Sequence, residues 1–188
     1  TPVRAALKLL VAEGMLVKRN GRGYQVRSFS EQDNIDAMSV CSVLEAQAAK
    51  ELTLKGLSRQ VEERFDKSLS MSEAVINRGL IDAEALKAFS LSNTIFHLTI
   101  IQASGNVFLE DCLARLSVLP GAETGAVHTA GDVSWSLARL VVSHDQHVIL
   151  KSAMAQGQAS RAFFLMQEHV SASFEYHDLF ARGVSGVQ

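Results

Sequence analysis

Apolar residues recur at helical spacing along almost the whole chain. The first stretch, residues 2–13, follows a Thr-Pro pair that suits the first turn of a helix, and Gly14 is its natural end. The spacing predicts a helix with Arg4 and Lys8 together on one basic face. Its opposite face, which we expect to be buried, comprises Val3, Ala6, Leu7, Leu10 and Val11.

The pattern then changes for a short distance before it becomes helical again. Residues 15–19 and 24–27 predict two short strands around the glycine-rich turn 20–23. An isolated hairpin is marginal in water, so we expect it to lean on the preceding helix. From residue 31 onward, helices are predicted at about 31–55, 58–78, 82–103, 106–118, 133–156 and 158–181, with a further short one before residue 130. The predicted fold class is therefore mostly α, with an antiparallel bundle of six or seven helices as the body.

Composition and cysteine content narrow the class of protein. The chain has 188 residues, of which 47% are hydrophobic and 20% charged, which is typical of a globular protein with a buried core. Cys41 and Cys112 are too few for a disulfide framework, which points to a reducing cytoplasm. No run approaches the roughly 18 to 20 apolar residues of a spanning helix, and the first residues do not form a signal sequence. We expect a cytoplasmic protein with no membrane partner.

Charge is distributed unevenly between the two parts of the chain. Residues 1–27 carry six basic side chains and one acid, a net charge of +5, whereas the remaining 161 residues carry a net charge of −7. Only the first part can therefore meet a polyanion such as DNA. From charge alone, a solvated basic helix and hairpin would be the favoured explanation of this part.

The order of residues in the basic part resembles the recognition helix and wing of GntR-family transcription regulators. The matching segments are Thr1-Pro2-Val3-Arg4-Ala5-Ala6-Leu7, Leu10, Glu13-Gly14, Leu16-Val17 and Gly21-Arg22-Gly23-Tyr24-Gln25-Val26. The resemblance implies that Arg4 reads base edges in the major groove while the helix and wing contact phosphates. The implied DNA-binding residues are Thr1, Arg4, Lys8, Arg19, Arg22 and Gly23. In such regulators two earlier helices complete the winged helix-turn-helix, and this chain starts at or just inside the third.

The body is similar to the ligand-binding domain of the FadR subfamily, called FCD, which is an antiparallel helical bundle. The motifs are Asn93-x-x-x-His97 followed by Ala103-Ser104-Gly105-Asn106, then His147-Val148-Ile149-Leu150, then Glu168-His169-Val170. The resemblance implies a divalent cation held by Asn93, His97, His147 and His169. Imidazole suits several transition metals, so zinc is our preference and nickel an alternative. The resemblance also implies a division of the chain into the end of a winged helix (1–27), a linker (28–32), an effector-binding and dimerisation domain (33–181) and a tail (182–188).

Two positions depart from the FCD pattern. Asn93 stands where the family usually has Asp, and a neutral amide is a weaker ligand than a carboxylate, so the metal can be absent altogether. Cys41 stands before the Leu44-Glu45 pair at a position where the family often has an Arg facing the effector. Arg139 lies two helical turns before His147 and can take the place of that missing arginine. Ser143 lies between Arg139 and His147. The predicted effector-binding residues are therefore Arg139, Ser143 and Cys41.

These observations favour a homodimeric regulator that binds a palindromic operator in double-stranded DNA under the control of a small metabolite, an organic acid. One alternative is a metal-dependent enzyme on the same bundle, since two or three histidines with an open position can activate water. Against it, no His-Glu-x-x-His motif occurs, Glu168 is turned about 100° from His169, and no other carboxylate is obviously placed as a general base. The other alternative is a metal-free regulator whose bundle only dimerises. We therefore predict that the protein is not an enzyme.

Overall fold

The structure is a computed structural model that describes residues 2–21, 23–117 and 137–175. The short helix expected before residue 130 lies outside the described residues. So do the start of the expected helix 133–156 and the end of the expected helix 158–181. Among the described residues there are seven α-helices and one two-stranded sheet, which confirms the predicted mostly α fold class. None of the described helices is long and apolar enough to cross a membrane.

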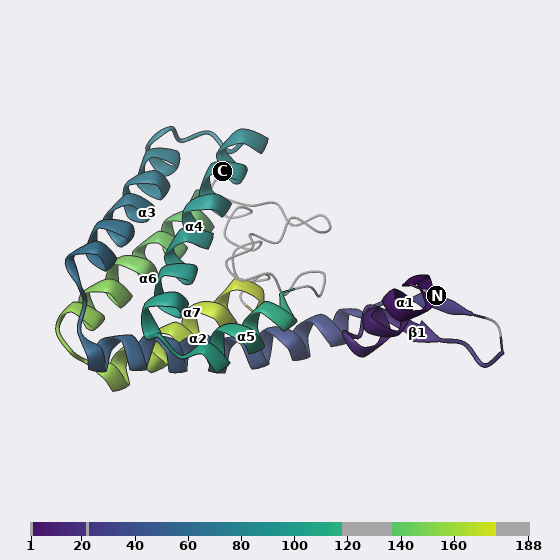
Figure 1. The fold of residues 1–188 in the computed structure, drawn as a ribbon. Coiled ribbons are helices and arrows are strands. Elements are labelled where there is room, and N and C mark those ends of the chain that lie inside the picture. The colour runs from purple at the N-terminus through teal and green to yellow at the C-terminus, as the bar shows by residue number, and fades with distance from the viewer. Residues whose placement is uncertain (1, 22, 118–136, 176–188) are drawn as a thin grey trace.

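The N-terminal elements form an arm that projects beyond the body (Figure 1). Helix α1 (Pro2–Ala12) is followed by strands β1 (Leu16–Lys18) and β2 (Tyr24–Val26), which pair antiparallel with Leu16 opposite Val26. Gly21 and Gly23 have φ angles of 71° and 90°, a conformation that glycine adopts at no steric cost and that closes the hairpin. The predicted helix and hairpin are both present.

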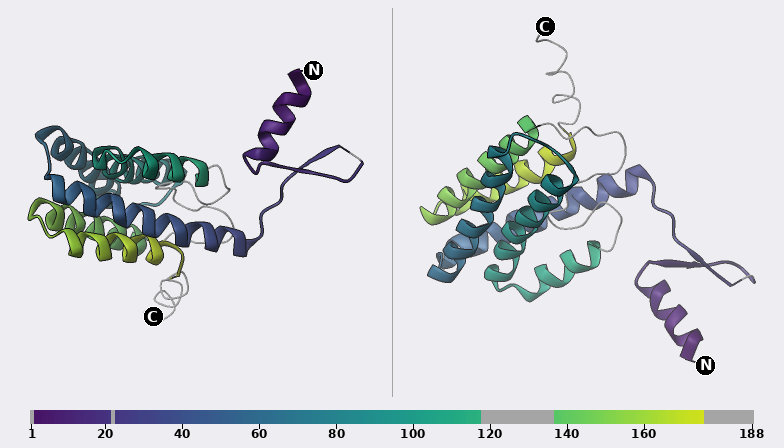
Figure 2. Two further views of the ribbon diagram at one scale, coloured as in Figure 1. Left: turned by 60° about the horizontal axis from the view of Figure 1, so that its bottom comes forward. Right: turned by 90° about the horizontal axis from the view of Figure 1, so that it is seen from above.

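The apolar face of α1 is more exposed than its spacing predicts. No residue of α1 is buried, and Val3 is 66% exposed. The expectation of a buried side was wrong for the described residues, because α1 packs mainly on β1 and Figure 2 shows the bundle lying apart from it. Burial of an apolar face requires a partner, and helical spacing alone does not provide one.

Six helices make up the described part of the body. They are α2 (Glu31–Lys55), α3 (Arg59–Asn77), α4 (Ala83–Ser104), α5 (Val107–Leu116), α6 (Leu137–Ala155) and α7 (Ala159–Glu175). Polar caps fix the starts of α2, α3, α4 and α5, and Ser30 and Asp33 at the start of α2 form a complete capping box. Gly105 ends α4 in the left-handed conformation, with φ 68°, and Asn106 then caps α5. The local sequence signals therefore fix most helix boundaries.

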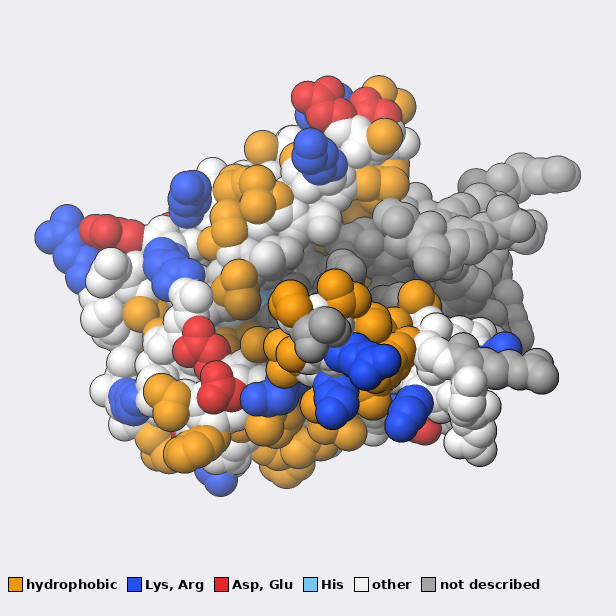
Figure 3. Space-filling view, turned by 45° about the vertical axis from the view of Figure 1, so that its right-hand side comes forward, with side chains coloured by type: hydrophobic (Ala, Val, Ile, Leu, Met, Phe, Trp, Pro, Cys, Tyr) orange, Lys and Arg blue, Asp and Glu red, His pale blue; other side chains and the backbone are white. Residues whose placement is uncertain are grey.

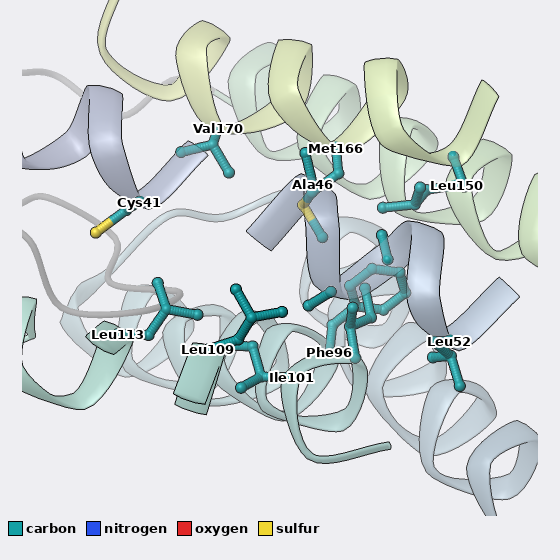
Figure 4. Packing of buried hydrophobic residues seen from close by; sticks show 14 of the residues in the cluster. Cys41, Ala46, Leu52, Phe96, Ile101, Leu109, Leu113, Leu150, Met166 and Val170 are labelled. Carbon is teal, nitrogen blue, oxygen red and sulfur yellow. The ribbon is translucent and has the colours of Figure 1, made fainter. Parts of the chain in front are cut away.

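Helix α2 is the central element of the bundle, since it packs against α7, α4, α5 and α6 (Figure 1). On the other side, α3 packs against α4 and α6, and α6 packs against α7. The core between them is filled by small side chains of α2, such as Ala46, and by larger ones such as Phe96 and Met166 (Figure 4). Small residues on α2 let its neighbours approach closely. This arrangement brings α4, α6 and α7 to one place in the interior.

Candidate metal centre

Three histidines from three helices meet in the interior of the bundle. His97 comes from α4, His147 from α6 and His169 from α7, and all three are buried. Their Nε2 atoms lie 3.2 Å (His97 to His169), 3.4 Å (His97 to His147) and 3.0 Å (His147 to His169) apart. Nitrogen ligands of a tetrahedral zinc, at Zn–N distances of about 2.05 Å, stand about 3.3 Å apart. The three nitrogens therefore have the spacing of one face of a metal site.

The outer nitrogens of two of these rings contact polar side chains. Nδ1 of His97 contacts Oε2 of Glu45, which belongs to α2, and Nδ1 of His169 lies 2.9 Å from Oε1 of Gln146. A carboxylate oxygen and an amide oxygen accept hydrogen bonds, so both contacts fit an Nδ1–H donor. The Nε2 lone pairs of His97 and His169 then face each other across 3.2 Å. A cation between them turns this repulsion into attraction, so the residues fit a metal ion.

Burial keeps the rings in the form that binds metals. Burial lowers the pKa of His169 to about 3, with the neighbouring His97 as the smaller cause. The pKa of His147 lies well below its usual value, first because of burial and then because of the other histidines around it. Metals bind neutral imidazole, and these two rings are neutral at pH 7. Little proton competition opposes metal binding there.

Phe96 holds the ring of His147 in place from one side. The two rings are stacked, with centroids 4.0 Å apart and planes inclined by 17°. Phe96 itself is fully buried and packs against Phe65, with centroids 4.9 Å apart. This aromatic contact excludes water and limits rotation of His147 about its side-chain bonds. The position of Nε2 of His147 therefore depends on the packing of α3 and α4.

The fourth predicted ligand, Asn93, lies one turn before His97 on α4 and is also buried, with 9% of its surface exposed. The cluster of metal-ligating side chains in the described part of the chain comprises the three histidines. The role of Asn93 as a ligand stays a prediction. Among the remaining histidines, His144 is half-buried and its Nδ1 lies 2.8 Å from Oγ of Ser72, while His128 and His177 lie outside the described residues.

The predicted effector-binding residues occupy different environments. Arg139 is buried on α6, and its guanidinium donates to the backbone carbonyl of Ser173. Burial lowers the pKa of this guanidinium. Ser143 is half-buried one turn further along α6, whereas Cys41 lies within the hydrophobic core (Figure 4). Arg139 and Ser143 thus share a helix with His147. The role of Arg139, Ser143 and Cys41 in effector binding stays a prediction.

Cys41 should be chemically inert in the native protein. Its side chain is 2% exposed, and burial, followed by the charge of Glu45, raises the pKa of the thiol to about 12. Because the thiolate is the reactive form, iodoacetamide at pH 8 should modify the exposed Cys112 and leave Cys41 intact. Peptide mass spectrometry measures both. In urea both should react, and equal rates in the native protein would contradict the prediction.

The predicted DNA-binding residues lie on the projecting arm. Arg4, Lys8, Arg19 and Gly23 are exposed, while Thr1 and Arg22 lie outside the described residues. Figure 3 shows Lys and Arg side chains gathered beside hydrophobic ones on the side from which the arm projects. Arg27 lies over the ring of Phe29, 4.7 Å from its centroid, and 3.7 Å from Asp33 at the start of α2. These contacts connect the end of the hairpin to the body.

Sequence reasoning missed two residues of the site, Glu45 and Gln146. Glu45 contacts Nδ1 of His97, away from the converging Nε2 atoms, and it was not among the predicted site residues. Glu45 and His97 are 52 positions apart in sequence, so no local motif links them. The only signal was the Leu44-Glu45 pair, which belongs to the FCD pattern. Gln146 adjoins His147 but contacts His169 instead, which becomes apparent only when α6 packs on α7.

An all-helical bundle preceded by a helix and a two-stranded hairpin is the fold of FCD-type transcription regulators. The family model of the FCD domain matches residues 36–172, so the chain belongs to the FCD-domain transcription regulators of the GntR family. Proteins of this family are regulators and not enzymes, which confirms the predicted class.

Relatives agree with this assignment. The HTH-type transcriptional repressor GlaR of Escherichia coli is 29% identical over 171 residues, which cover 90% of this chain and 75% of GlaR. The structure of E. coli McbR/YncC has a TM-score of 0.67 at 16% identity and covers 94% of this chain and 83% of that one. A GntR-family regulator from Pseudomonas syringae pv. tomato has a TM-score of 0.51 at 19% identity, covering 100% and 73%. These two likenesses concern the fold alone.

Proposed function

We propose that this protein is a regulator whose affinity for operator DNA is controlled by a small organic acid bound beside a divalent metal in the helical domain. The observation that carries the proposal is the convergence of the Nε2 atoms of His97, His147 and His169 at 3.0–3.4 Å. Asn93 would complete the ligand set. Zinc is the preferred metal, with nickel as the alternative, because imidazole suits both.

The metal, when bound, supplies a Lewis acid that attracts a carboxylate of the effector. Besides the metal, Arg139 would be a second positive group. It lies on α6, two turns before His147, and a buried guanidinium can form a strong charge-assisted hydrogen bond with an anion. Ser143 lies between them and adds a hydroxyl. Cys41 lies within the core with a thiol of raised pKa and would contribute an apolar contact.

The arm would read the operator. Arg4 is placed in the first turns of α1, where the guanidinium of a recognition helix can reach guanine edges in the major groove. Lys8, Arg19 and Gly23 would lie along the phosphates, together with Thr1 and Arg22. We propose a homodimer on a palindromic site, with a FadR-type sensor domain pairing the subunits in the cytoplasm. Residues 1–27 would form the C-terminal part of a winged helix.

Operator binding with and without effector tests this function. Operator fragments selected from random DNA should bind the zinc-loaded protein, and at least one member of a library of small carboxylates should change the affinity about tenfold, a typical allosteric coupling. The Arg4→Ala variant should lose the selected site and serves as the control for specific binding. Fluorescence anisotropy measures each step. An affinity that no carboxylate changes would refute effector control, and equal effects with and without zinc would favour the metal-free regulator.

A further inference from the structure

The three histidines and Asn93 are all neutral ligands, so a divalent cation bound by them would bring a double positive charge into the interior of the bundle. Burying a charge is costly unless an opposite charge or well-aligned dipoles compensate it. Asn93, at the position where the resemblance to the FCD family implies an Asp, contributes no charge. Another negative group close to the ligands would restore the balance.

Glu45 is that group. Its side chain is buried, with 2% of its surface exposed, and its Oε2 contacts Nδ1 of His97, on the opposite side of the ring from the nitrogen that faces the cluster. Glu45 belongs to α2, the central helix, whose packing against α4 fixes the position of the carboxylate. A carboxylate in this position makes the imidazole a stronger electron donor and fixes its tautomer and orientation.

We propose that Glu45 provides, through His97, the negative charge that Asn93 does not, and that Glu45 and Gln146 are positioning residues that hold the Nε2 lone pairs of His97 and His169 toward the cation. Gln146 lies 2.9 Å from Nδ1 of His169 and has no charge. The asymmetry matters, because one ring receives charge and orientation and the other receives orientation only. This inference rests on the proposed metal site.

The Glu45→Gln substitution tests the charge separately from the hydrogen bond, since the glutamine oxygen can still accept from Nδ1 of His97. Loss of an outer partner of a metal ligand costs about 10- to 100-fold in metal affinity. We expect the zinc affinity of Glu45→Gln to fall at least about tenfold. Competition with a chromophoric chelator on the full chain measures it. Thermal unfolding without metal shows whether the variant is folded.

Glu51→Gln is the matched control. Glu51 also lies on α2 and also accepts hydrogen bonds, from Gln47 and Asn106, but it does not contact the cluster. Its zinc affinity should equal that of the wild type. A wild-type protein that binds no zinc would overturn the proposed metal site itself. A wild type that binds zinc, with Glu45→Gln binding equally well, would overturn only the role of Glu45.

Nitrogen chemical shifts of the histidines provide a readout that a purely structural role would not move. In metal-free wild type, His97 and His169 should both be protonated at Nδ1. Gln146→Leu should change the tautomer or broaden the signals of His169 and leave those of His97 unchanged. Its zinc affinity should fall about tenfold. A His169 tautomer that remains Nδ1-protonated in Gln146→Leu would overturn the positioning role of Gln146.

Discussion

Replacing His147 with alanine should abolish zinc binding at the proposed site. The substitution removes one of three converging nitrogens, and since losing an outer partner alone costs about 10- to 100-fold, losing a ligand should cost more than about 100-fold. A wild type at a free zinc concentration about 1,000 times its dissociation constant gains about 4 kcal/mol of stability, whereas a variant that binds more than about 100-fold more weakly should gain less than about 1.4 kcal/mol. Zinc titration followed by thermal unfolding measures both quantities.

His144→Ala is the matched control for this prediction. His144 lies one turn before His147 on α6, but its ring contacts Ser72 on α3 and not the cluster. Its zinc affinity should stay within about threefold of the wild type, because it loses one side-chain hydrogen bond and no ligand. Stoichiometric zinc in His147→Ala at wild-type affinity would show that the histidine cluster does not hold the metal.

Replacing Phe96 with alanine should have the largest effect on stability. Phe96 is fully buried, packs on Phe65 and stacks on His147. A buried Phe→Ala change costs about 3–5 kcal/mol through lost transfer energy and the cavity that remains. Urea unfolding with a chelator present measures the free energy of unfolding without any contribution from metal. Zinc affinity should also fall, because the ring of His147 loses the surface that holds it.

Phe108→Ala provides the comparison for the same change at an exposed position. Phe108 lies in the first turn of α5 and is 78% exposed. Its replacement should change the free energy of unfolding by no more than about 0.5 kcal/mol. If Phe96→Ala cost less than about 1 kcal/mol, the packing between α3, α4 and α6 would not be as tight as described, and the position of His147 would need another explanation.

Helical spacing and cap residues predicted the elements of this protein closely. Each predicted helix of the described body is present, because capping residues such as Ser58 and Asp82 and stop residues such as Gly105 act within one helical turn. The buried face of α1 was not predicted correctly, because burial depends on a neighbouring surface. Periodicity indicates which side of a helix is apolar and does not indicate what covers it.

The sequence by itself determined the helices, the charge contrast between arm and body, and the identity of His97, His147 and His169 as candidate ligands. Caps, turns and charge depend on residues close together in the chain, whereas the three histidines were identified through the resemblance to the FCD pattern. Only the tertiary structure decided that the three rings converge at 3.0–3.4 Å and that Glu45 and Gln146 support two of them. Those contacts join residues 22 to 72 positions apart, and their geometry is fixed by how α2, α4, α6 and α7 pack.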